Sequence, residues 1–180
     1  MVWRFLFNPD LCLGCRSCEL ACRNEYAAKG GERWRWVSEA FEESVKTGYF
    51  LSLSCNHCEN PECIRVCLNG TYRKRKDGIV LHDPKHCSGC GRCIRACPFS
   101  APKYSLITGR VDKCNLCVDR LDNGQPAACV AACPVGAISH LFPNEPDPKR
   151  ATESVTGFGD IKITKPSTRF IRLVPKDQVE

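Results

Sequence analysis

The chain has 180 residues, of which 43% are hydrophobic and 26% charged, and its formal net charge is +6. Sixteen residues are cysteine, a share of roughly 9% that is far above ordinary usage and indicates that sulfur organises the fold. The N-terminal MVWRFLFNPDLC has neither the basic start nor the apolar run of about 7–15 residues of a signal peptide. No apolar run approaches the roughly 18 residues of a membrane-spanning helix. We therefore expect no secreted disulfide framework and no direct membrane span.

The start of the chain predicts a strand, a turn and a short helix. Residues 1–7 alternate as a strand does, and residues 8–10, Asn-Pro-Asp, predict a turn into the first cysteines. A helix over residues 17–27 would carry Cys18 and Cys22, which lie about one helical turn apart.

Residues 23–54 contain no cysteine. Within them, RWRW at residues 33–36 alternates like a strand. We expect a strand and a loop that cover a metal site. Contact of Trp34 and Trp36 with a partner protein is the alternative.

The later elements are a hairpin, a strand and a tail. Asp77-Gly78 between strand-like flanks predicts a β-hairpin within residues 70–81, and we interpret its basic run RKRK as a solvated face. Residues 134–138 predict a strand. Residues 141–180 contain no cysteine and several prolines, so we expect an extended tail that contacts a partner, with an edge strand at residues 169–173.

The cysteines form an internal repeat of four groups with none left over. Groups one and three have the spacing C-x2-C-x2-C-x3-C, whereas the middle gap is four residues in group two and eleven in group four. In chain order the groups are Cys12, Cys15, Cys18 and Cys22; Cys55, Cys58, Cys63 and Cys67; Cys87, Cys90, Cys93 and Cys97; and Cys114, Cys117, Cys129 and Cys133.

This spacing indicates [4Fe–4S] clusters. A C-x2-C-x2-C loop wraps one face of a cluster, and in two-cluster ferredoxins the fourth cysteine of each run ligates the other cluster. Sixteen thiolates therefore predict four clusters in interlocked pairs. Zinc and disulfides are the alternatives, but zinc sites pair two short C-x2-C elements and need no third cysteine in register. His57 is expected to lie near a cluster without ligating it, because cysteines fill every ligand position.

The clusters would also account for the excess of basic residues. Each [4Fe–4S] core with its thiolates carries about −2 or −3, so four would bring the net charge from +6 to about −2 to −6. We therefore interpret the basic residues as compensation for cluster charge, not as a nucleic-acid surface. Cations beside the cysteines would stabilise reduced clusters and raise their potentials. The candidates are Arg16, Arg92, Arg95 and Lys113.

The ordered motifs resemble those of one known family, the iron–sulfur electron-transfer subunits of the dimethyl sulfoxide reductase and polysulfide reductase type of molybdenum enzymes. The motifs that carry this resemblance are LCLGCRSCELAC, SCNHCENPECIRVC, CSGCGRCIRACPFSAPKY, KCNLCVDRLDNGQPAACVAACPVGAI and ITKPS. The resemblance implies an α+β fold of two interlocked ferredoxin-like modules with short helices and β-hairpins. Residues 1–51 and 106–140 would form the first module, residues 52–105 the second, and residues 141–180 the extended tail.

The resemblance also implies a pairing that the spacing leaves open. Groups one and four would share two clusters, and groups two and three the other two, in a line with two ends. We name the implied sites A (Cys12, Cys15, Cys18, Cys133), B (Cys22, Cys114, Cys117, Cys129), C (Cys55, Cys58, Cys63, Cys97) and D (Cys67, Cys87, Cys90, Cys93).

The resemblance further implies partners at both ends of the line. One would be a large catalytic subunit with a molybdopterin or tungstopterin cofactor, the other an integral-membrane anchor that exchanges electrons with quinol. We expect the chain to fold in the cytoplasm and to reach the membrane only through its partners. No Ser–His–Asp group, phosphate loop or dinucleotide fingerprint is visible, so we expect electron transfer without a catalytic site. A freestanding polyferredoxin and a hydrogenase- or formate-dehydrogenase-linked ferredoxin subunit are the alternatives.

Overall fold

The computed structural model describes residues 2–26 and 31–173, and these form short strands and short helices. The strands are β1 (Arg4–Phe7), β2 (Trp36–Glu42), β3 (Thr47–Leu53), β4 (Tyr72–Lys74), β5 (Val80–His82), β6 (Lys103–Ser105), β7 (Arg110–Asp112), β8 (Ile138–Leu141), β9 (Ala151–Thr152) and β10 (Arg169–Ile171). The helices are α1 (Ser17–Tyr26), α2 (Glu62–Arg65), α3 (Arg92–Ala96), α4 (Val118–Asp122) and α5 (Ala128–Ala131), with 3₁₀ turns η1 (Pro9–Leu11) and η2 (Pro84–His86). This mixture confirms the predicted combination of short helices and small sheets.

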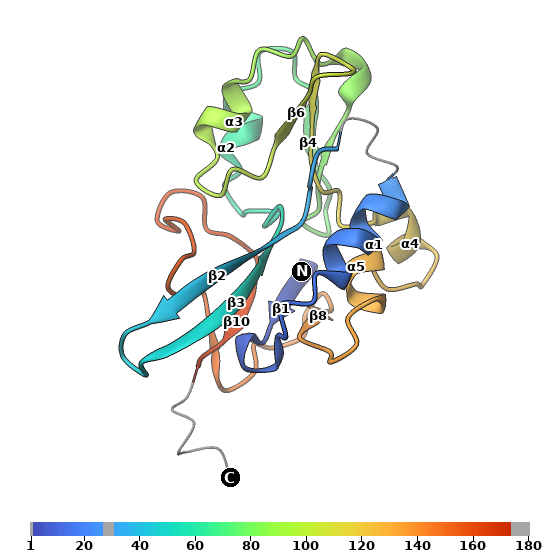
Figure 1. Cartoon of the computed structure of the whole chain (residues 1–180). Helices are drawn as coiled ribbons and strands as arrows, with labels where there is room; N and C mark the ends of the chain where they lie inside the picture. Colours follow the sequence, from blue (N-terminus) through green and yellow to red (C-terminus); the bar gives the residue numbers. More distant parts are fainter. Residues whose placement is uncertain (1, 27–30, 174–180) are drawn as a thin grey trace.

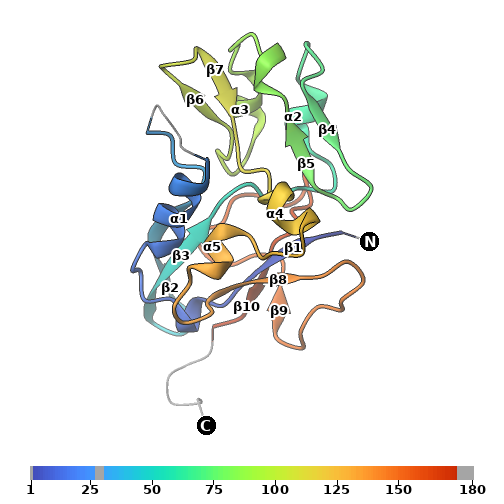
Figure 2. The same cartoon turned by 90° about the vertical axis from the view of Figure 1, so that its right-hand side faces the viewer.

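One lobe, at the top of Figures 1 and 2, contains α2, α3 and the antiparallel hairpins β4–β5 and β6–β7. The hairpin predicted at Asp77-Gly78 is confirmed, and Gly78 has the left-handed φ of 83° that its turn requires. Its basic run is largely exposed, as expected, but Lys74 donates to the Cys58 carbonyl at 3.0 Å and Arg75 pairs with Asp122 at 2.8 Å. The β6–β7 hairpin crosses the expected module boundary between residues 105 and 106.

The other lobe is organised by a four-stranded sheet of order β8-β1-β10-β9. Strand β1 follows the predicted alternation, because Phe5 and Phe7 point into the core. It pairs antiparallel with β8 and parallel with β10. The strand expected near residues 169–173 therefore forms, but it lies between β1 and β9 and not at an edge. The fully buried Phe170 of β10 packs on Phe7 of β1 with ring centroids 6.4 Å apart.

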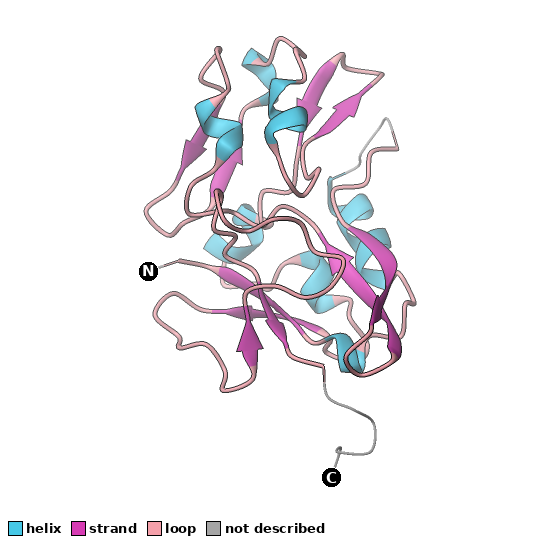
Figure 3. Ribbon diagram, turned by 90° about the vertical axis from the view of Figure 1, so that its left-hand side faces the viewer, coloured by secondary structure: helices cyan, strands magenta, loops and turns pink. Residues whose placement is uncertain are grey.

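The predicted helix carrying Cys18 and Cys22 is α1, and both cysteines face the interior. Beside it lies the longest hairpin, β2–β3, which Figure 3 shows extending along the edge of the molecule. The strand expected at residues 33–36 begins at Trp36. Val37, Leu51 and Leu53 bury the inner face of this hairpin, so that it covers the cysteines behind it.

Residues 142–168 contain only the two-residue strand β9, and the rest of the segment is loop, as Figure 3 shows. They nevertheless pack on the body of the molecule, because Thr164, Ser167 and Thr168 are buried. Within the described part of the chain, no helix combines the length and apolar character that crossing a bilayer demands.

Candidate iron–sulfur centres

The first C-x2-C of each group has one backbone feature in common. The residue before the second cysteine adopts a left-handed conformation in all four groups, at Gly14, His57, Gly89 and Leu116, with φ between 44° and 71°. This conformation turns the peptide N–H back toward the first cysteine. Gly89 N donates to Cys87 Sγ and Leu116 N donates to Cys114 Sγ, both at 3.4 Å. The loops thus present amide donors to sulfur, which stabilises a charged thiolate.

Site C is a cavity lined by all four of its predicted cysteines. Burial and the neighbouring thiols, Cys55 foremost, raise the pKa of Cys58 and Cys63 to about 12. Two buried donors on the wall of this cavity, Asn56 Nδ2 and Thr164 Oγ1, have no hydrogen-bond partner in the described part of the chain. An unpaired buried donor costs about 1–3 kcal/mol, so a group rich in acceptors, such as the sulfides of a cluster, fits this cavity.

Site D is a second cavity, and it too is lined by its four predicted cysteines. The Thr71 hydroxyl lies 3.1 Å from Cys67 Sγ. Although burial opposes the Cys67 thiolate, the hydrogen bonds from Thr71 lower the pKa of Cys67. Burial raises the pKa of Cys93, and the Tyr72 hydroxyl beside it, which is buried and has no hydrogen-bond partner among the described residues, opposes that rise. Site D therefore also offers an unused donor beside sulfur.

At the predicted sites A and B, burial and neighbouring thiols together raise the pKa of cysteine side chains. Burial raises the pKa of Cys12, and the Gly14 backbone N–H lowers it in part. The neighbouring thiols of Cys18, Cys133 and Cys15 raise it further. These are the other three members of site A. Burial likewise raises the pKa of Cys22, with contributions from the remaining members of site B, which are Cys114, Cys129 and Cys117. Thiols of groups one and four therefore lie near one another although they are far apart in the sequence, and their division into sites A and B stays a prediction.

All sixteen cysteines are free of disulfide bonds. Among the described residues, no three His, Cys, Asp or Glu side chains are spaced closely enough to hold one metal ion. In a [4Fe–4S] cluster each cysteine binds a different iron. The wider spacing of the cysteines around a common cavity fits that arrangement.

His57 is 2% exposed and accepts a hydrogen bond from Val80 N at its Nδ1 atom, 3.0 Å away. Burial, and then the positive charges of Lys113, Lys74 and Arg35, hold its pKa well below 6.5. The ring is therefore neutral and carries its proton on Nε2. This hydrogen bond joins the Cys55–Cys58 loop to β5.

The cations predicted beside the cysteines separate into two classes. Arg16, Arg92 and Arg95 are exposed, whereas Lys113 is 1% exposed and lines site C. Sequence reasoning missed a second buried cation, Arg35, which is 3% exposed. One feature of the sequence pointed to its burial. Alternate residues of an extended segment face the same side, so Arg35 shares a face with the apolar Val37.

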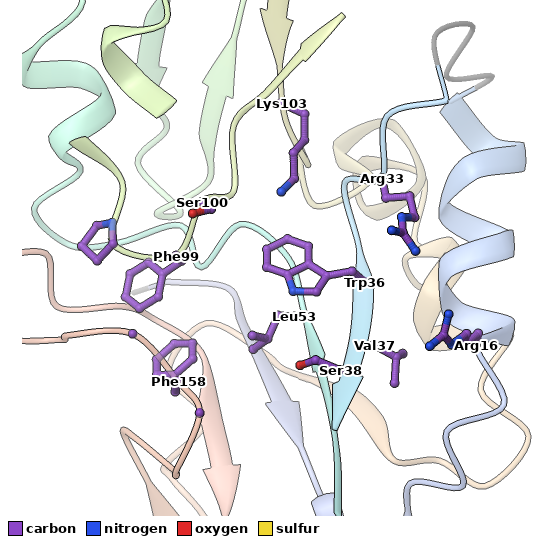
Figure 4. A pocket seen from close by; sticks show the side chains of 13 residues that line it. Arg16, Arg33, Trp36, Val37, Ser38, Leu53, Phe99, Ser100, Lys103 and Phe158 are labelled. Carbon is purple, nitrogen blue, oxygen red and sulfur yellow. The ribbon is translucent and has the colours of Figure 1, made fainter. Parts of the chain in front are cut away.

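The two tryptophans of this segment have different surroundings. Trp34 packs on Tyr26 with ring centroids 4.7 Å apart, and Tyr26 stabilises the thiolate of Cys117 in site B. Trp36 faces a groove beside site A, and the Lys103 ammonium lies 4.4 Å from its ring centroid (Figure 4). Trp34 thus packs over site B, as the sequence predicts for this segment, whereas Trp36 lines a surface groove.

That groove is basic. Three cations, Arg16, Arg33 and Lys103, line it together with Trp36, Phe99 and Phe158, as Figure 4 shows. No acidic side chain is among the described residues that line it. Arg16 lies in the ligand loop of site A, and Phe99 follows the site C ligand Cys97 by two residues.

Comparisons with known proteins agree with this geometry. A 4Fe-4S dicluster domain matches residues 46–141, and a 4Fe-4S binding domain matches residues 9–27. One chain of the anaerobic dimethyl sulfoxide reductase of Haemophilus influenzae is 35% identical over 176 residues, which cover 91% of this protein and 85% of the relative. Its counterpart in the anaerobic dimethyl sulfoxide reductase of Escherichia coli is 39% identical over 146 residues, covering 74% and 70%.

This protein belongs to the family of iron–sulfur subunits that includes these dimethyl sulfoxide reductase chains. A subunit of the tetrathionate reductase of Salmonella typhimurium extends the similarity, at 36% identity over 170 residues that cover 91% of this protein and 67% of the relative. As a member of the family, the chain is an electron-transfer iron–sulfur subunit of an oxidoreductase, and it binds [4Fe–4S] clusters. The names of these relatives refer to reductases of two different substrates, dimethyl sulfoxide and tetrathionate. The feature common to them and to this chain is therefore the iron–sulfur chemistry and not a substrate.

Proposed function

We propose that the chain relays single electrons through four [4Fe–4S] clusters held at sites A, B, C and D. The observation that carries this proposal is the pair of cavities at sites C and D, each lined by four cysteines from two different groups. Bound clusters supply the one-electron chemistry. The protein holds the thiolates in place, offers amide and hydroxyl donors to sulfur, and excludes water from the inner sites.

The contacts between sites support the order A–B–C–D. Cys18 of site A adds to the raised pKa that burial gives Cys129 of site B. Cys55 of site C does the same for Cys114 of site B. The buried Tyr72 lies close to Cys93 of site D and also close to Cys63 of site C. Each site therefore neighbours the next, as a linear relay requires.

The same contacts support two interlocked modules. Sites C and D share groups two and three within residues 52–105, while sites A and B take their cysteines from residues 1–51 and 106–140. We propose that residues 141–180 complete the assembly, with a described part that packs on both modules.

We further propose that the chain has no catalytic site and serves a large catalytic subunit with a molybdopterin or tungstopterin cofactor, and a membrane anchor at the other end. Its relatives include subunits of dimethyl sulfoxide and tetrathionate reductases. The basic groove next to the ligand loop of site A fits an acidic segment of the catalytic subunit, because three cations and no acidic side chain are among the described residues that line it. The chain would fold in the cytoplasm, where thiols stay reduced, and reach the membrane through its partners.

Metal analysis of anaerobically purified protein tests the proposal. Iron and acid-labile sulfide should each approach about sixteen atoms per chain, and the pterin subunit should co-purify. Zinc in place of iron, or about eight iron atoms, would contradict the four-cluster relay. A stable iron-loaded monomer without a partner would instead favour a freestanding polyferredoxin.

A further inference from the structure

Two buried cations lack the carboxylate partners that buried cations normally require. Within residues 2–26 and 31–173, neither Arg35 nor Lys113 forms an ion pair with an Asp or Glu side chain. Arg35 is 3% exposed and Lys113 is 1% exposed. A buried charge is costly unless an opposite charge compensates it, so the compensation has to come from other groups. The thiolates are the anionic groups that surround both side chains.

Arg35 lies where sites A and B meet. Its Nη1 donates to Ser52 Oγ at 3.1 Å, and Ser52 Oγ lies 3.4 Å from Cys18 Sγ of site A. Its Nη2 donates to Ser54 Oγ at 2.9 Å, and its Nε has no hydrogen-bond partner within residues 2–26 and 31–173. The guanidinium also lies over the Phe5 ring, 4.6 Å from the centroid, which keeps water away from one face.

The other neighbours of Arg35 belong to site B. Burial lowers the pKa of Arg35, but the thiolates of Cys129 and Cys114 in site B, with those of Cys18 and Cys22, more than reverse this. In return, Arg35 stabilises the thiolate of Cys129. One guanidinium therefore faces cysteines of both sites.

Lys113 occupies the corresponding position between sites B and C. Its Nζ donates to the carbonyl of the site B ligand Cys114 at 2.9 Å and to the carbonyl of Val80 at 2.5 Å. The same side chain lines the cavity of site C. These two backbone carbonyls accept from two of its three N–H donors and leave its full charge uncompensated.

We propose that Arg35 and Lys113 are shared counterions at the two inner junctions of the relay, each raising the potentials of the two clusters on either side of it. The proposal rests on the four-cluster function proposed above. Reduction adds one negative charge to a cluster, and a nearby buried cation stabilises that charge more strongly than an exposed one. Neither cation lines the cavity of site D, so that site should be insensitive to them.

The test is an anaerobic redox titration of the purified native complex followed by electron paramagnetic resonance, with each signal assigned by the cysteine variant that removes it. Arg35→Gln should lower the midpoint potentials of sites A and B. Lys113→Gln should lower those of sites B and C. Neither substitution should move site D. The matched control is Arg95→Gln, which removes an exposed cation between two cysteines and should shift no site comparably.

Three outcomes would overturn the proposal: unchanged potentials, equal shifts at all four sites, or an equal shift from Arg95→Gln. If the glutamine variants fail to retain iron, the charge-conserving variants Arg35→Lys and Lys113→Arg distinguish a requirement for charge from a requirement for packing. Restored iron content and near-native potentials would support a requirement for charge. Failure of the charge-conserving variants as well would assign these positions to packing alone. Iron and sulfide content of the unaltered protein is measured in parallel, so a failure of the four-cluster function itself would be recognised separately.

Discussion

Sites C and D are neighbours with related cysteine motifs, yet the protein builds them differently. Site D has its four predicted ligands within residues 67–93 and an unpaired donor at Tyr72, close by in the sequence. Site C is completed by Lys113 and by Thr164, which is more than sixty residues beyond its last cysteine. One site is thus made by local sequence, and the other depends on a distant segment.

The segment that completes site C consists of residues 163–168, which we call the strap. Its backbone pairs with the ligand loop: Asn60 N donates to Thr164 O at 3.0 Å and Glu59 N to Lys165 O at 2.8 Å. Ser167 contributes two further bonds to the same loop, at 2.9 Å each. The strap therefore fixes the loop of site C, whereas no residue of it lines site D.

The largest expected effect comes from releasing the strap at its anchor. Phe170 is fully buried and packs on Phe158 and Phe7, so Phe170→Ala should cost about 3–5 kcal/mol of folding free energy. Thermal unfolding followed by visible absorbance should begin at a lower temperature, with site C losing iron before site D. Phe41→Ala, at a position 49% exposed, is the control and should change little. Simultaneous loss of both sites would contradict the separate role of the strap.

A glycine substitution should affect site D instead. A Cβ at Gly89 would stand 2.1 Å from the Gly109 carbonyl oxygen, and its φ of 71° is left-handed. Gly89→Ala should therefore cost more than about 2 kcal/mol, because the clash adds to the roughly 1–2 kcal/mol of the conformation itself. Gly70→Ala, with φ 58° and open space around it, carries only the conformational cost. Equal unfolding temperatures for the two variants would argue against the clash.

A smaller effect is expected where the strap meets a polar side chain of site C. Thr168 Oγ1 donates to Asn56 Oδ1 at 2.8 Å, and both residues are buried. Thr168→Val leaves that oxygen unpaired, at a cost of about 1–3 kcal/mol, measured by thermal unfolding. Thr152→Val, at a half-buried position whose hydroxyl donates to the nearby Ser154 carbonyl at 3.2 Å, is the control and should cost less.

The difference between the sites also explains what could be predicted. The loops opening groups one and three begin alike, since Asn8 caps η1 and Asp83 caps η2, each followed by proline. Such local patterns predict strands, turns, helices and candidate cysteine ligands from the sequence, and the hairpin at Asp77-Gly78 is predicted in the same way. The partition of the cysteines into sites A to D came from the family resemblance, and it stays a prediction.

The rest depended on tertiary contacts between distant residues. Alternation placed Arg35 on a strand face, but nothing local indicated that sites A and B would enclose it. The sequence predicts an extended tail in contact with a partner, and that contact stays a prediction. The sequence did not indicate that Thr164 would turn back into site C or that Phe170 would enter the middle of a sheet. The pairing of β10 with β1 joins residues more than 160 positions apart, beyond the reach of periodicity.

The smallest expected effect is on the midpoint potentials of sites C and D, each of which has one unpaired hydroxyl beside its cysteines. Tyr72→Phe removes the unpaired donor beside Cys93 and should lower the midpoint potential of site D, because a hydroxyl that faces sulfur stabilises the reduced state. Thr164→Val removes the equivalent donor at site C and should lower the potential of site C alone. Redox titration of both variants under identical conditions is the measurement. Each serves as the control for the other, and a shift of the same site in both would show that the two cavities are not tuned independently.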